Sequence, residues 1–137
     1  MKKKQKEQVY LAGHQRSWVW GRHPVCEVLD AQCWPIRELF LAEELPTKDR
    51  VTAQGKSEQL GATTCIVNYD RIRALCGCKD HQGYLARMGP FPYAQVDEIL
   101  LNAPIMPLYI LLDSIRDTYN FGAIIRSSAA LGGTAVI

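Results

Sequence analysis

The sequence predicts an α/β fold, in which helices pack on a sheet. Segments with helical and with strand-like spacing of apolar residues alternate along the chain. Hydrophobic residues make up 47% of the sequence and charged residues 22%, as in ordinary globular domains. No apolar run approaches the roughly 20 residues that span a bilayer, so we expect no membrane protein.

The first half of the chain supplies most of the alternating elements. Apolar residues at helical spacing predict a helix over residues 24–31, and a polar, exposed helix is expected over 48–60 with Gly61 as its cap. A short third helix is expected over 71–75, with Asp70 as its N-cap. Alternating or β-branched residues predict strands at 36–41, 63–67 and 84–87.

Prolines indicate where this region ends. Four of the seven prolines lie in the segment 89–107, which predicts a linker with a short turn of helix at 95–101. The linker separates a domain of residues 17–88 from a second region of residues 108–137.

The second region begins with a strand at 108–112 that is apolar on both faces, which is typical of a parallel sheet. A polar loop follows at 113–119, and another strand begins at 134–137. A β-α-β unit needs a sheet of several strands. We therefore expect this region to be a piece of a larger domain, either truncated or completed by another chain.

The helix between these two strands is expected over residues 121–131, with Asn120 as its N-cap. The pair Gly132 and Gly133 is a stop signal. Helical spacing predicts a buried stripe of Phe121, Ile124, Ile125 and Ala129.

The net charge of +2 is unevenly distributed. Residues 1–16 carry five basic side chains and one acidic side chain, so the remainder of the chain is slightly acidic. This basic tail either attracts phosphate or keeps the chain in solution. It lacks the apolar stretch of a secretory signal.

The five cysteines are expected to be reduced thiols in the cytoplasm, because their number is odd and no secretory signal is present. Cys76 and Cys78 with His81 nearby suggest a metal cluster, but the C-x-C spacing lacks a matching second half. We therefore expect no metal site and interpret the cysteines as small buried hydrophobic residues.

Residues 112–127 resemble the first motif of the SpoU (TrmH-type) branch of SPOUT RNA methyltransferases. In that family Leu-Asp is followed by a short loop, then Asn, an apolar residue, Gly-Ala, two apolar residues, Arg and Ser or Thr. The sequence matches at Asp113, Asn120, Gly122, Ala123 and Arg126. It departs at Thr118, where the family commonly has proline, and at Tyr119, where it often has histidine.

An upstream match extends this resemblance to about residues 18–137. Residues 20–25, with the sequence Trp-Gly-Arg-His-Pro-Val, resemble the opening of the RNA 2'-O-ribose methyltransferase substrate-binding domain. His81-Gln82-Gly83 and residues 90–93 resemble its end. The fit is best to bacterial enzymes that methylate a guanosine ribose in 23S ribosomal RNA, and to their organellar relatives.

The resemblance implies an L30e-like α/β substrate-binding domain followed by the first β-α elements of an α/β-knot (SPOUT) domain. The full-length enzyme would be a homodimer that transfers a methyl group from S-adenosylmethionine to a ribose 2'-hydroxyl of rRNA or tRNA. Its cofactor-binding residues are expected beyond residue 137. The chain of 137 residues is therefore expected to bind RNA, to bind no S-adenosylmethionine and to be inactive. The alternative is a stand-alone, non-enzymatic L30e-like RNA-binding module.

The resemblance implies catalytic roles for Arg126 and Asn120. A guanidinium with a pKa above about 12 is a poor base, so Arg126 is expected to position phosphate or ribose. Asn120 either organises the active-site loop or only caps its helix. Asp113 is expected to brace the loop, and Gly122 either allows close approach of RNA or serves packing.

A set of polar residues in predicted turns, together with Arg126, forms the expected RNA-binding group. For the histidines, hydrogen bonding to backbone groups is an equal alternative, and Arg116 is as readily a solvated loop charge. Trp18 and Trp20 either stack on bases or pack in the core. The expected RNA-binding residues are Arg22, His23, His81, Gln82, Arg116 and Arg126.

Overall fold

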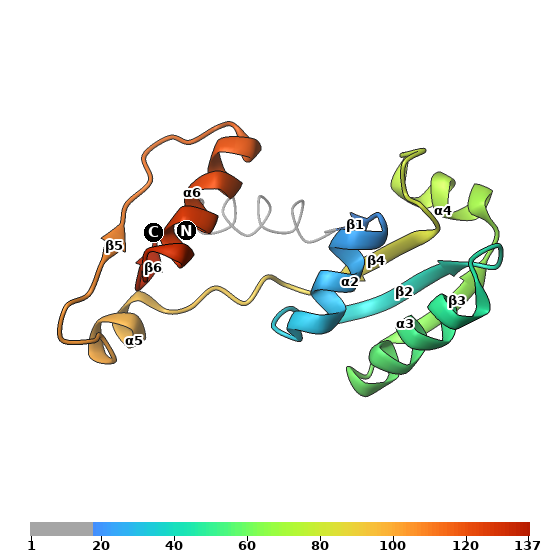
Figure 1. Cartoon of the computed structure of the whole chain (residues 1–137), viewed down its shortest axis with the longest axis horizontal. Coiled ribbons are helices and arrows are strands. Elements are labelled where there is room, and N and C mark those ends of the chain that lie inside the picture. Colours follow the sequence, from blue (N-terminus) through green and yellow to red (C-terminus); the bar gives the residue numbers. More distant parts are fainter. Residues whose placement is uncertain (1–17) are drawn as a thin grey trace, which may run out of the picture. The chain divides into compact units, whose positions relative to one another are not determined.

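The computed structural model describes residues 18–137, which form two compact units (Figure 1). The first unit ends at Pro92, and the second comprises Tyr93–Ile137. The division falls inside the segment 89–107 that was expected to be a linker. The expected basic tail at residues 1–16 lies outside the described residues.

The first unit is built on a four-stranded sheet in the order β1-β4-β2-β3. Strands β2 and β3 are parallel, whereas β4 runs antiparallel to both β1 and β2. The three predicted strands are confirmed, and β1 was not predicted because three residues are too few to show alternation. The bounds are β1 Trp18–Trp20, β2 Ile36–Ala42, β3 Thr63–Val67 and β4 Tyr84–Met88.

Three helices cover this sheet: α2 (Arg22–Ala31), α3 (Thr47–Gln59) and α4 (Tyr69–Cys76). Gly61 follows the end of α3 with a left-handed backbone (φ 68°), as its role in ending the helix requires. The prediction of Asp70 as the N-cap of α4 is wrong. Asn68 is the cap, because its backbone is extended and its side-chain oxygen accepts a hydrogen bond from the Arg71 N–H at 2.9 Å.

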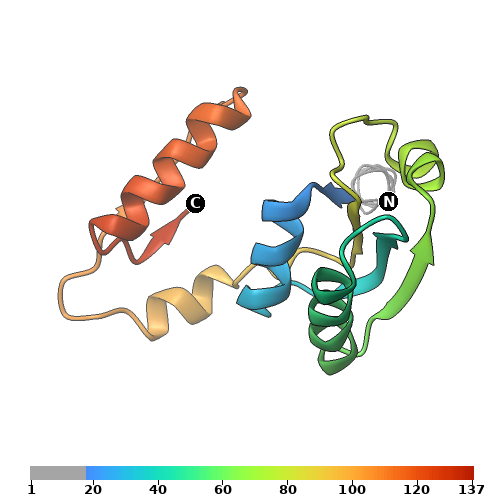
Figure 2. The same cartoon turned by 45° about the vertical axis from the view of Figure 1, so that its right-hand side comes forward.

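The helices enclose the sheet from both sides. Helices α2 and α3 lie beside each other on one face, as Figure 2 shows, and α4 packs on the other. Strand β2 serves both faces, because Leu39 and Leu41 join the larger cluster with α2 and α3 while Ala42 joins α4. The most deeply buried side chains of these two clusters include Val25, Leu29, Leu39, Leu41, Ile72 and Leu85.

The second unit is smaller and consists of α5 (Val96–Leu101), β5 (Tyr109–Ile110), α6 (Thr118–Ala130) and β6 (Ala135–Val136). Strands β5 and β6 pair in parallel, as a β-α-β unit requires, and the predicted short helix is confirmed as α5. The prediction of a five-residue strand buried on both faces is wrong. Only two residues are in the strand, and Leu111 is 77% exposed, because the described residues give β5 one neighbouring strand and one helix.

Helix α6 begins earlier than expected. Asp117 is its N-cap and accepts a hydrogen bond from the Tyr119 N–H at 3.0 Å, so the prediction of Asn120 as the cap is wrong. Asn120 instead lies in the first turn, and the helix ends before Gly132, whose backbone is left-handed. None of the described helices is long and apolar enough to cross a membrane.

The predicted buried stripe on α6 is also wrong. Phe121, Ile125 and Ala129 are exposed, Ile124 is half-buried, and Ser128 is the buried residue of the helix. Helical spacing determines which residues share a face, but burial also requires a surface for that face to pack on. The small two-stranded sheet of the described second unit does not cover it.

Candidate nucleic-acid interface

Four chain segments meet at one edge of the first unit's sheet: residues 21–23, 43–47, 68–69 and 81–83, here called the carboxyl edge. Strands β1, β2 and β3 end at this edge, and β4 begins there, because β4 alone runs antiparallel. Backbone hydrogen bonds join the segments: the N–H groups of Gly21, Ala42 and Glu43 donate to the carbonyls of Tyr84, Gly83 and Val67 at 3.1, 2.9 and 2.9 Å.

The three helices of the first unit all begin at the carboxyl edge, since each follows a strand that ends there. A helix N-terminus carries partial positive charge and points its first backbone N–H groups outward. The side chains of Arg22, His23, Lys48 and Arg71 belong to the first turns of these helices and are exposed. This arrangement favours anionic ligands, although Asp49 and Asp70 lie in the same turns and reduce the positive charge.

The loop formed by His81, Gln82 and Gly83 has an unusual backbone. Gln82 and Gly83 both have positive φ angles, 52° and 80°. A Cβ atom added to Gly83 would lie 2.9 Å from Leu45 Cδ2, so close packing as well as backbone angle requires glycine here. The loop is therefore held in one tight conformation between β4 and the segment that follows β2.

His81 is inside this loop rather than on its surface. Its side chain is 2% exposed, Nδ1 accepts a hydrogen bond from the Gly83 N–H at 3.1 Å, and its ring lies 5.1 Å from that of Tyr69. The alternative that His81 satisfies a backbone group is thus confirmed. Because the imidazole is buried, it affects a ligand only by fixing the conformation of the loop.

Gln82 connects the loop to the beginning of α2. Its side-chain oxygen accepts a hydrogen bond from the Arg22 N–H at 3.0 Å, so it supplies the cap that Gly21 cannot provide. The Arg22 guanidinium extends to Asp49 of α3, with 3.6 Å between nitrogen and oxygen, and both side chains contact solvent. Arg22 and Gln82, which were predicted as RNA-binding residues in two separate turns, therefore lie in direct contact.

The two candidate stacking residues differ in exposure. Trp18 packs against Phe40, with ring centroids 5.9 Å apart, and belongs to the core on the α4 side of the sheet. Trp20 is 42% exposed and immediately precedes the carboxyl edge. Core packing thus applies to Trp18, whereas Trp20 presents an accessible ring.

The cysteines do not form a metal cluster within the part of the chain that the structure describes, where no group of three or more potential ligands comes together. Cys78 Sγ accepts a hydrogen bond from the Asp80 N–H at 3.3 Å. Burial raises the pKa of the Cys26 thiol. The interpretation of all five as buried is wrong: Cys33, which follows the end of α2, is exposed, and the other four are half-buried.

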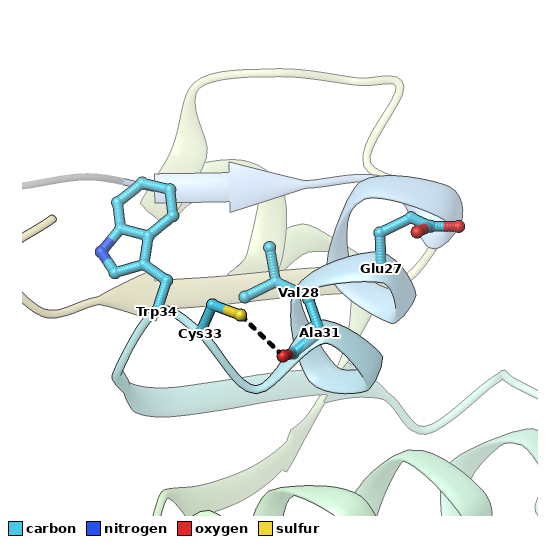
Figure 3. A pocket seen from close by; sticks show the side chains of 5 residues that line it. All are labelled: Glu27, Val28, Ala31, Cys33 and Trp34. Atoms are coloured by element: carbon cyan, nitrogen blue, oxygen red, sulfur yellow. Dashed lines mark hydrogen bonds between the residues drawn. The ribbon is translucent and has the colours of Figure 1, made fainter. Parts of the chain in front are cut away.

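A shallow pocket of about 240 Å³ surrounds Cys33 at the far end of α2 from the carboxyl edge (Figure 3). Glu27, Val28, Ala31 and Trp34 complete its lining, and Cys33 Sγ donates a hydrogen bond to the Ala31 carbonyl at 2.9 Å. Trp34 Nε1 donates to the Gly89 carbonyl at 2.9 Å. The pocket contains none of the predicted site residues.

In the second unit, α6 carries both predicted catalytic residues, but their side chains do not lie together. Asn120 and Arg126 are six positions apart, so on a helix with 3.6 residues per turn they point roughly 120° apart. Gly122, one turn before Arg126, lies under its guanidinium: a Cβ there would be 3.3 Å from Arg126 Nη1. Both predicted catalytic side chains are exposed.

The loop before α6 holds the other two predicted residues. Asp113 Oδ1 accepts a hydrogen bond from the Ser114 hydroxyl at 2.8 Å, and Ser114 has a positive φ of 56°. This hydrogen bond joins Asp113 only to its immediate neighbour, and a role in bracing the whole loop stays a prediction. Arg116 is exposed in the same loop.

Residues 18–94 match the family model described as RNA 2'-O ribose methyltransferase substrate binding. Proteins named as uncharacterized tRNA/rRNA methyltransferases are similar in sequence. The one from Mycobacterium avium is 34% identical over 122 residues, and that from Mycolicibacterium vanbaalenii is 37% identical over 129 residues. Each match covers 87% of this chain, which spans only 39% of each relative.

Solved structures show the same fold. An AdoMet-bound rRNA methyltransferase from Sinorhizobium meliloti superimposes with a TM-score of 0.69 at 20% identity, covering 94% of this chain and 46% of that protein. The SpoU methyltransferase AviRb from Streptomyces viridochromogenes, solved with AdoMet, gives a TM-score of 0.65 at 22% identity, covering 91% and 45%. Because the substrate-binding family model matches more than half of this chain, the chain belongs to the SpoU-type RNA 2'-O-ribose methyltransferase family.

Proposed function

We propose that residues 17–88 form the RNA-binding domain of a SpoU-type methyltransferase and that the carboxyl edge is its RNA-binding surface. The observation that carries this proposal is the junction of Gln82 with Arg22, which unites the two predicted RNA-binding segments within the substrate-binding match. Three helix N-termini and exposed basic side chains at the same edge supply the charge that phosphate oxygens require.

Within this proposal the residues have different tasks. Arg22 and His23 contact phosphate or ribose, and Trp20 offers a ring on which an unstacked base can lie. Gln82 and the buried His81 hold the loop in place against the start of α2. Arg116 and Arg126 of the second unit serve the same RNA, with Arg126 orienting the ribose.

The activity we propose for the whole protein is transfer of a methyl group from S-adenosylmethionine to a ribose 2'-hydroxyl of ribosomal or transfer RNA, by a homodimer in the cytoplasm. Its support is the family and the names of the relatives. Methyl transfer to RNA by the whole protein tests it, and absence of any transfer would contradict it.

The described second unit does not itself offer a cradle for this cofactor. In its one glycine pair, Gly132 has a left-handed backbone (φ 74°) that ends α6, and Gly133 is closely packed, since a Cβ there would lie 2.1 Å from Ser128 Oγ. The described residues of the second unit therefore do not fit the cofactor. We expect the 137-residue chain alone to bind RNA without methylating it.

The RNA-binding surface is tested by the variant Arg22→Gln, with Arg37→Gln as its matched control. Both arginines are exposed, but Arg37 lies near the beginning of β2, at the opposite edge of the sheet. Loss of one charge-assisted phosphate contact is expected to weaken binding about tenfold and to lower the salt slope by about one.

The measurement is fluorescence anisotropy with transcribed large-subunit rRNA domains and with total tRNA. The salt concentration is varied from about 50 to about 200 mM, the range over which affinity from phosphate contacts falls steeply. Arg37→Gln should bind like the unaltered chain. Equal losses in both variants would show that general charge, and not the carboxyl edge, accounts for binding.

A further inference from the structure

A second pocket, also of about 240 Å³, opens between α2 and α3 next to the carboxyl edge. Its apolar lining comes from Leu29 of α2 and Ala53 of α3, together with Cys26. Arg22, in the first turn of α2, belongs both to this pocket and to the carboxyl edge. The pocket is thus continuous with the proposed RNA-binding surface.

Tyr84 also lines this pocket, and its hydroxyl has no protein partner there. The residue is 2% exposed, and within the described residues its phenol oxygen makes no hydrogen bond. The oxygen is not among the fully enclosed polar atoms without a partner, so it reaches the pocket and is open to a hydrogen bond with a ligand. Burial, with the nearby Asp49 carboxylate, raises the pKa of Tyr84, so the hydroxyl keeps its proton and remains a donor.

Basic side chains surround the pocket. Arg22 is paired with Asp49, and Lys56 is paired with Asp30, to which its ammonium donates. Lys48, also part of the lining, belongs to no ion pair among residues 18–137. An anionic group near the first turn of α3 therefore has a cation available without breaking an existing pair.

The size and chemistry of the pocket restrict the ligand. Pockets for whole drug-sized molecules measure roughly 300–1,000 Å³, so this smaller one suits a single flat fragment. The fragment needs apolar faces for Leu29 and Ala53, an acceptor for the Tyr84 hydroxyl and a negative charge near Lys48. A nucleobase with its own phosphate has all three features.

We propose that this pocket holds one unstacked nucleotide of the bound RNA, with its base against Leu29 and Ala53, a base acceptor on the Tyr84 hydroxyl and its phosphate at Lys48. This inference rests on the proposed function, because the nucleotide would come from RNA on the carboxyl edge. RNA recognition commonly uses bases that are splayed out of the helix. Tyr84 is then a specificity-determining residue.

The test is titration of the full chain with the four ribonucleoside 5'-monophosphates and with inorganic phosphate, followed by amide and methyl chemical shifts. We expect at least one monophosphate to shift Leu29, Ala53 and Tyr84, whereas inorganic phosphate shifts Lys48 without those three. The proposal would be overturned if inorganic phosphate shifted Leu29, Ala53 and Tyr84, or if no monophosphate shifted these three residues at millimolar concentration.

The variant Tyr84→Phe removes only the hydroxyl, and Tyr119→Phe, exposed on α6, is the matched control. Loss of one hydrogen bond should weaken monophosphate binding about five- to tenfold, while Tyr119→Phe leaves it unchanged. Thermal unfolding of both variants verifies that the fold is retained. Equal monophosphate affinities in Tyr84→Phe and the unaltered chain would also reject the pocket.

RNA binding by the same variants separates this inference from the proposed function. If the chain binds RNA, Arg22→Gln weakens that binding and Tyr84→Phe does not, the pocket is rejected and the carboxyl edge stands. If the unaltered chain does not bind RNA at all, the proposed function itself fails.

Discussion

The two units of this chain use apolar residues in opposite ways. In the first unit, Leu39 and Leu41 are fully buried between the sheet and its helices. In the second, large apolar side chains such as Ile105, Met106 and Leu131 are exposed, and the buried residue of α6 is a serine. Apolar content alone therefore does not produce a core, since a core needs layers of secondary structure to enclose it.

The largest expected difference between the units is in the cost of removing a leucine side chain. Leu39→Ala leaves a cavity in the first unit and should lower its free energy of unfolding by about 2–5 kcal/mol. Leu111→Ala, on an exposed side chain, should change it by less than about 0.5 kcal/mol. Urea unfolding followed by tryptophan fluorescence measures this, because all three tryptophans lie in the first unit. Equal losses would show that the units unfold as one.

A smaller difference is expected between two left-handed glycines. Gly83→Ala combines an unfavourable backbone angle with a clash against Leu45, for a loss of roughly 2–4 kcal/mol in the same unfolding experiment. A Cβ on Gly132 has nothing within 4 Å, so Gly132→Ala strains only the end of α6. The first unit's transition should remain unchanged in that variant. A loss in Gly83→Ala no larger than about 1 kcal/mol would contradict the close packing.

The smallest expected effect compares the two helix caps. Asn68→Ala removes the cap of α4 and should lower the free energy of unfolding of the first unit by about 1 kcal/mol. Asp117→Ala removes the cap of α6 and should leave that transition unaltered. Hydrogen exchange of the amides in each helix locates the two effects. Loss of protection in α4 after Asp117→Ala would refute independent units.

Periodicity predicted the elements better than their ends or their burial. The strands at 36–41 and 63–67 were found because their side chains alternate or are β-branched, and β1 was missed because three residues show no period. Both caps were assigned to the wrong residue within three positions of the right one. Asn68 and Asp70, or Asp117 and Asn120, are chemically equivalent caps, and only the backbone angles select between them.

The candidate site was predicted as separate pieces. Turn chemistry indicated Arg22, His23, His81 and Gln82, but nothing local shows that Gln82 accepts a hydrogen bond from a backbone group 60 residues away. Nor did the sequence distinguish the buried His81 from a surface contact. For Tyr84 the sequence predicts only a strand, because the surroundings of its hydroxyl depend on how α2 and α3 pack.

The pairing of β1 with β4 has a consequence for modularity. Trp18 lies opposite Arg87 in that antiparallel pair, so the chain enters and leaves the domain at neighbouring points. A domain whose ends meet tolerates circular permutation and insertion into a host loop. Joining residue 88 to residue 18 through a short linker, with new ends in an exposed turn, would preserve the sheet order.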